Sequence, residues 1–272
     1  MVAERVRAAR TIARRELFAL LRSPSPLVAL GVALTAASLG VRTVLGEIAE
    51  SGLLARASPL YFPLFVATVV LASALAISST LSVAREREAG TLEVLFYGPV
   101  DATACVVGKY AAQVLAYLAL CPLLAASLLA YAWLTSLRFS GDLVLGLLLS
   151  ALAAACTIAF GIFLSTLCGS IRAAILILVG VGGALIAVQA GSWLLAGLPA
   201  RSVALAVVGP ALAAANHVVN VVSPFAYLDR GMEAALVGDP GAYAGAVLSS
   251  LVYVAVLLVG ATWSLHRRGV RP

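Results

Sequence analysis

Long runs of apolar residues, separated by short polar stretches, dominate the chain from residue 26 onward. Six of these runs have the ~20 residues that a helix needs to cross a bilayer. The pattern therefore predicts an all-α integral membrane protein in which residues 1–272 form a single transmembrane domain. The six expected spans are 26–46, 60–83, 105–134, 143–168, 173–197 and 243–265.

The first part of the chain, residues 2–22, has a different pattern. Apolar side chains recur every three or four positions, and arginines occupy the other side. This periodicity is typical of an amphipathic helix that lies in the membrane interface. We expect the helix to end at Ser23-Pro24-Ser25-Pro26, because proline is excluded from helix interiors. A basic, solvated tail is the alternative, but it would not need the apolar stripe.

Residues 198–242 differ from an ordinary loop. Residues 203–215 are almost wholly apolar but too short to cross a bilayer, and prolines and asparagines flank them. We expect an external re-entrant helical hairpin between spans five and six. A seventh span at about 203–222 is the alternative, and it would move the C-terminus to the other side of the membrane.

Composition and charge define the class and the orientation. Hydrophobic residues make up 62% of the chain and charged residues 11%, against about 25% charged residues in soluble domains. Thirteen of the eighteen Lys and Arg residues fall on the side that holds both termini and the segment 84–104. By the positive-inside rule this side is cytoplasmic. We therefore predict a multi-pass protein of the cell membrane, surrounded by lipid, whose charge of +6 reflects topology and not binding to nucleic acid.

The chain has no motif for chemistry of its own. All twelve Asp and Glu residues fall at span ends or in loops, whereas ion-driven transporters usually carry ionisable groups within the membrane. A secondary transporter would have to bind its ion through backbone carbonyls at broken helices. Gly108-Lys109 is followed by Tyr110, and Thr103 stands where a Walker A loop needs glycine. The two histidines and four cysteines match no protease or metal motif. We predict neither an enzyme nor a metal site, so any energy must come from another subunit.

The most polar stretch follows the second expected span. It is Arg85-Glu86-Arg87-Glu88-Ala89-Gly90-Thr91-Leu92-Glu93-Val94-Leu95. Its charges of both signs can pair with a partner protein, and Gly90 before Thr91 would let one short helix end and another begin. We interpret segment 85–95 as a docking surface. A solvated loop whose charges only fix topology is the alternative from physical chemistry alone.

The order of these residues carries a family resemblance. Together with Pro99 and with Gly108-Lys109 at the start of the next span, it closely resembles the signature of type-2 ATP-binding-cassette (ABC) transporter permeases. Ser223-Pro224-Phe225 with Arg230-Gly231 resembles the segment before the last span in the branch that includes permeases linked to gliding motility and to copper-enzyme maturation. The resemblance extends over the whole chain.

The resemblance implies a permease subunit of an ATP-driven exporter. It would pair with a second permease, as a homodimer or a heterodimer, and with two separate ATPase subunits that hold ATP and Mg. The N-terminal amphipathic helix would lie along the inner leaflet and contact the ATPase. A second, smaller cytoplasmic contact would be the turn of Gly169, Ser170 and Arg172. The coupling residues would be Arg85, Glu86, Arg87, Glu88, Gly90, Thr91, Leu92 and Glu93.

Substrate and mechanism are less determined by the sequence. A membrane scaffold or assembly factor that holds a cytoplasmic partner without transport is the alternative function.

A few polar residues in or near the spans are candidates for a substrate path, although small polar residues commonly join helices by hydrogen bonds. These candidates are Gln113, Gln189, Asn216, His217 and Asn220.

Overall fold

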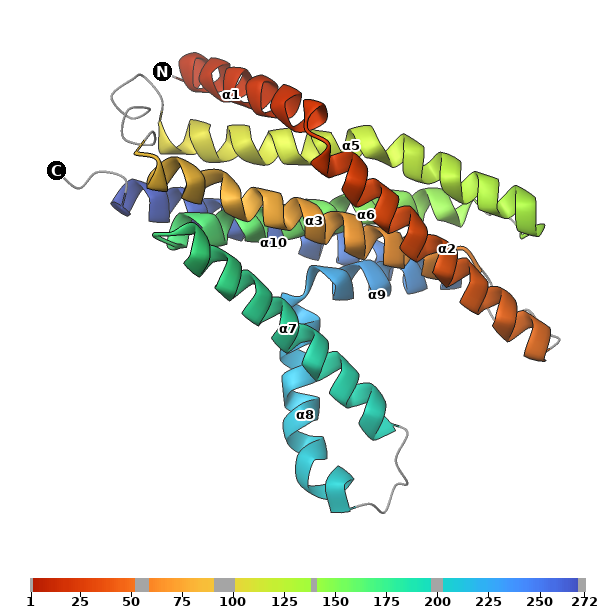
Figure 1. Cartoon of the computed structure of the whole chain (residues 1–272). Coiled ribbons are helices and arrows are strands. Elements are labelled where there is room, and N and C mark those ends of the chain that lie inside the picture. The colour runs from red at the N-terminus through yellow and green to blue at the C-terminus, as the bar shows by residue number, and fades with distance from the viewer. Residues whose placement is uncertain (1, 52–58, 91–100, 138–140, 197–202, 269–272) are drawn as a thin grey trace.

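The computed structural model describes residues 2–51, 59–90, 101–137, 141–196 and 203–268. Within these ranges every regular element is an α-helix (Figure 1). The helices are α1 (Val2–Arg22), α2 (Ser25–Ser51), α3 (Tyr61–Glu88), α5 (Ala102–Thr135), α6 (Asp142–Leu167), α7 (Ile171–Ala196), α8 (Val203–Val222), α9 (Pro224–Val237) and α10 (Pro240–Arg268).

Six of the described helices, α2, α3, α5, α6, α7 and α10, are long and apolar enough to cross a membrane. This confirms the predicted all-α membrane fold. Two spans end clearly later than expected. Helix α2 continues to Ser51, where we expected an end at residue 46, and α3 continues to Glu88, where we expected one at residue 83. The first residues of segment 84–104 therefore extend a span and do not form a separate helix.

The centre of the bundle is the pair α3 and α6, which lie side by side (Figure 1). Their backbones approach closely because the contact is made by small residues. A Cβ atom at Gly161 would lie 2.6 Å from the carbonyl oxygen of Ala76 and would also strike the Ser79 hydroxyl. That hydroxyl donates a hydrogen bond to the carbonyl oxygen of Ile158 across the helix pair (3.3 Å). Helices α2, α5 and α10 pack around this pair.

Helices α8 and α9 meet at a sharp bend of 83°. Pro224 stands at the first turn of α9, where its fixed φ and missing N–H are tolerated. Arg230 donates to the carbonyl oxygen of Asn220 (2.7 Å), and its guanidinium covers the Tyr227 ring at 5.1 Å. A Cβ at Gly231 would lie 2.7 Å from Leu149 of α6, so glycine lets α9 pack closely on the bundle. By length and composition the bent pair fits a re-entrant hairpin or a broken span, so the topology of 198–242 stays a prediction.

Helices α7 and α8 lean away from the bundle (Figure 1). Only 6% of the apolar window of α7 is buried within the chain. The glycines of α7 have little to pack against among the described residues. Cβ atoms at Gly180, Gly182 and Gly183 would meet nothing within 4 Å, and one at Gly191 would lie 3.4 Å from Leu212 of α8.

Candidate functional site

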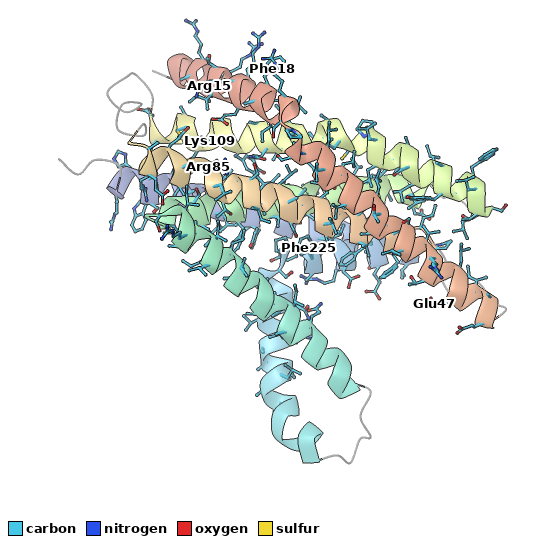
Figure 2. All side chains as sticks on the ribbon, in the orientation of Figure 1. Arg15, Phe18, Glu47, Arg85, Lys109 and Phe225 are labelled. Atoms are coloured by element: carbon cyan, nitrogen blue, oxygen red, sulfur yellow. The ribbon has the colours of Figure 1, made fainter. Side chains whose placement is uncertain are left out.

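The described part of the predicted coupling residues lies at one end of the bundle, which we call the basic end. Here α3, α6 and α10 finish and α5 and α7 begin (Figure 1). Arg85 and Lys109 lie at this end, whereas Glu47 lies at the opposite one (Figure 2). We define the basic end by Arg85–Gly90, Lys109, Cys168–Arg172 and Arg267.

The end of α3 has the geometry that the sequence indicates. The N–H groups of Ala89 and Gly90 donate to the carbonyl oxygens of Arg85 (3.0 Å) and Arg87 (3.1 Å). Gly90 has φ +68°, a left-handed conformation that glycine adopts without the penalty of a Cβ atom. A helix ends just before Gly90, as predicted, but it is the span α3 and not a separate short helix. The other predicted coupling residues, Thr91, Leu92 and Glu93, lie outside the described residues.

Arg87 and Glu88 bind the turn between α6 and α7. The Arg87 guanidinium donates to the carbonyl oxygen of Cys168 (2.7 Å). The Glu88 carboxylate accepts a hydrogen bond from the N–H of Ile171 (2.7 Å), at the start of α7, where a negative charge is favourable. The described part of the first predicted cytoplasmic contact, 85–90, is therefore joined to the second, 169–172, within one chain. We call these two bonds the turn clamp.

A second pair of bonds supports the turn clamp one turn deeper. The Ser165 hydroxyl oxygen of α6 accepts from the backbone N–H groups of Val83 (3.1 Å) and Ala84 (3.0 Å) of α3. Ala84 also packs in a small buried cluster with Cys168 and Ala174. The last turn of α3 is thus fixed to both α6 and α7.

Glu86 faces the other way, toward α5. Its carboxylate accepts a hydrogen bond from the Lys109 ammonium at 2.8 Å, and the same ammonium lies 3.3 Å from the carboxylate of Glu16 in α1. Lys109 is only 3% exposed. The neighbouring Gly108 lies against α1, where a Cβ would be 2.9 Å from the carbonyl oxygen of Ala9. The Gly108-Lys109 pair of the sequence motif therefore contacts the N-terminal helix.

Helix α1 uses part of its predicted apolar face against its own chain. Ala13 is buried, and Leu17 and Leu20 are half-buried. Val6, which the periodicity places on the same face, is 63% exposed. Phe18 is exposed together with the arginines on the outer side (Figure 2). Residues Val2–Arg22 form a helix, whereas its amphipathic role at the membrane interface stays a prediction.

The outward-facing side chains at the basic end have charges of both signs. Arg85 and Glu88 at the end of α3 are exposed. Gly169 in the turn and Arg172 at the start of α7 are also exposed, while Ser170 is half-buried. Such a surface can bind a protein partner by charge pairing.

Sequence reasoning identified the charges but missed Glu16 and Ser165, and it gave Lys109 no role. Glu16 is 93 residues from Lys109 in the chain, and Ser165 is about 80 residues from its partners. A pattern within one segment cannot show such pairs. One signal for Lys109 was present, because the only lysine of the chain stands at the start of an apolar run.

The structure does not gather the five candidate path residues. Gln113 is buried in the bundle and donates to the Ser78 hydroxyl (3.1 Å). Gln189 and His217 are exposed on α7 and α8, and Asn216 and Asn220 are half-buried on α8. Gln113 thus forms the interhelical hydrogen bond that was the competing interpretation, and the substrate path stays a prediction.

These features define a class, a multi-pass helical membrane protein with charged residues gathered at one end of the bundle. A family model described as ABC-2 family transporter protein matches residues 47–263. The chain therefore belongs to the ABC-2 transporter family and is the permease component of an ABC transporter. Membership implies an ATP-binding-cassette partner and an oligomeric permease. No curated protein matches the chain.

Proposed function

We propose that this permease exports substrate across the cell membrane by alternating access, driven by a separate ATPase subunit that docks on the basic end. ATP and Mg are held by that partner. Both termini and the basic end face the cytoplasm, because thirteen of the eighteen positive residues fall on this side. A second permease, identical or related, completes the transporter.

The observation that carries the proposal is the turn clamp. Arg87 and Glu88 attach the end of α3 to the turn before α7, so segment 85–90 and turn 169–172 form one surface. A partner that pushes on this surface moves α3, α6 and α7 together. Rigid movement of packed helices is a common form of conformational switching.

The contacts also suggest different roles for different charged residues. Glu86, Arg87 and Glu88 bind groups of their own chain, so we assign them the role of holding the surface in shape. Arg85 and Arg172 are exposed, and we assign them to direct pairing with acidic groups of the ATPase. Thr91, Leu92 and Glu93 continue the same segment and are proposed to extend this contact.

The mechanism follows from this division. ATP binding closes the ATPase dimer, and the docked surfaces of the two permeases approach each other. The end of α3 is fixed to its neighbours. The movement therefore reaches the central α3–α6 pair and is not absorbed by a flexible connection. The two permeases then pass between inward-open and outward-open states.

The test is affinity purification of the tagged permease in mild detergent, with mass spectrometry of bound proteins. We expect a stoichiometric ATPase with the wild type and its loss in the double variant Arg85→Glu/Arg172→Glu. The matched control is Arg42→Glu, an exposed arginine of α2 away from the basic end, which should retain the ATPase. Retention in the double variant would refute the docking assignment. Recovery of wild type in its native lipid with no ATPase would favour the scaffold alternative.

A further inference from the structure

Lys109 joins three helices at the basic end. We propose that Lys109 is a positioning residue that fastens the N-terminal helix α1 to the end of α3, so that α1 moves together with the ATPase docking surface. The consequence for transport rests on the proposed function. The link itself does not, because it is a contact within one chain.

Each N–H donor of the Lys109 ammonium group has an acceptor within reach. It has three N–H donors and lies within hydrogen-bond distance of three acceptors. These are the carboxylates of Glu86 (2.8 Å) and Glu16 (3.3 Å) and the carbonyl oxygen of Ser82 (3.3 Å). Two acceptors belong to α3 and one to α1, while the lysine itself belongs to α5. A buried ammonium is costly without such partners, so its burial requires both helices in place.

Helix α1 packs mainly on α5, so its connection to α3 has to come from a specific bond. Helix α1 packs extensively on α5, and Gly108 permits the contact because a side chain there would strike the carbonyl oxygen of Ala9 and the side chain of Ile12. Its packing against α3 is slight by comparison. The bond from Glu16 through Lys109 to Glu86 therefore gives α1 an ionic connection to the docking surface.

This connection depends on the positive charge of Lys109. The Glu16 and Glu86 side chains are about one quarter exposed, and one oxygen of the Glu86 carboxylate, Oε2, is buried. Without the lysine charge, two carboxylates from different helices would face each other, and like charges repel. Loss of Lys109 should thus separate α1 from α3 while leaving the turn clamp of Arg87 and Glu88 intact.

The experiment is hydrogen exchange with mass spectrometry on the purified permease in lipid nanodiscs, first without nucleotide. In Lys109→Met we expect α1 to exchange about 10- to 100-fold faster, since each lost hydrogen bond to a charged group shifts an opening equilibrium by roughly this factor. Glu16→Ala, at a more exposed position, should give a smaller rise. Lys109→Arg should restore slow exchange. The control is Gln113→Met, which removes a hydrogen bond between α5 and α3 in which α1 takes no part.

A second step adds the ATPase and a non-hydrolysable nucleotide. In the wild-type complex, nucleotide should change exchange both at the end of α3 and in α1. In Lys109→Met the change should persist at the end of α3 and disappear from α1. Unchanged α1 exchange in both Lys109→Met and Glu16→Ala would overturn the link whatever the function of the protein. A faster α1 with its nucleotide response intact would overturn the transmission and leave the docking proposal standing.

Discussion

Replacement of Gly161 by alanine should destabilise the permease, because this glycine sits where the backbones of α3 and α6 meet. The added Cβ would lie 2.6 Å from the carbonyl oxygen of Ala76. Ordinary van der Waals contact begins at 3.4 Å, so α3 must retreat locally by roughly 0.8 Å. The obstacle is backbone, which cannot rotate away as a flexible side chain can.

The magnitude follows from three contributions. Overpacking a close contact costs about 1–3 kcal/mol, and a clash with backbone belongs at the upper end. The hydrogen bond from Ser79 to Ile158 is lost, at about 0.6 kcal/mol in a membrane bundle. The higher helix propensity of alanine offsets about 1 kcal/mol of this loss in unfolding free energy. The net loss is about 2.5 kcal/mol, which corresponds to a fall in melting midpoint of roughly 5–10 °C.

The assay is size-exclusion chromatography after heating in detergent, with the folded peak followed against temperature. The matched control is Gly180→Ala in the membrane-spanning helix α7, where a Cβ would meet nothing within 4 Å. The midpoint of this control should stay at or slightly above that of the wild type. Equal midpoints for Gly161→Ala and Gly180→Ala would refute the close contact between α3 and α6.

Two further predictions concern the ends of helices. Gly90→Val should weaken ATP hydrolysis by the assembled transporter, because φ +68° costs a side chain about 1–2 kcal/mol and the segment beyond it would be redirected; wild-type hydrolysis rates would show that the turn needs no glycine. Arg230→Gln should speed hydrogen exchange around the bend between α8 and α9, since the bond to Asn220 and the contact with the Tyr227 ring are lost. Unchanged exchange in that segment would mean that Pro224 alone maintains the bend.

The membrane fold could be predicted because each span is specified by its own composition. An apolar run of sufficient length must be a helix in a bilayer, whatever surrounds it. The same holds for Gly90, whose effect on the backbone is local. The boundary of α3 was predicted too early, since charged residues at 85–88 suggested that the span had ended. These side chains remain helical because α6, α7 and Lys109 supply their partners.

The candidate site could be located from the sequence but not assembled from it. Charges at 85–88 indicated a protein contact, yet the partners of Arg87 and Glu88 lie 81 and 83 residues further along the chain. Arg87 donates to a backbone carbonyl, and Glu88 accepts from a backbone N–H. Almost every residue carries both groups, so no residue type marks these partners in the sequence. The sequence therefore suggested pairing with another protein for charges that bind backbone groups of their own chain.

These contacts within the chain bear on how, under the proposed function, a small surface at the basic end can move a membrane bundle. A loop held only at its ends would absorb the displacement of a docked partner. Here the last turn of α3 is bound to α6 and α7 through the turn clamp and Ser165, and to α5 and α1 through Lys109. Packed interiors resist gradual deformation and shift between discrete arrangements. Under the proposed docking, we expect a displacement applied at Arg85 to move these helices as a body and to reach the α3–α6 contact at Gly161.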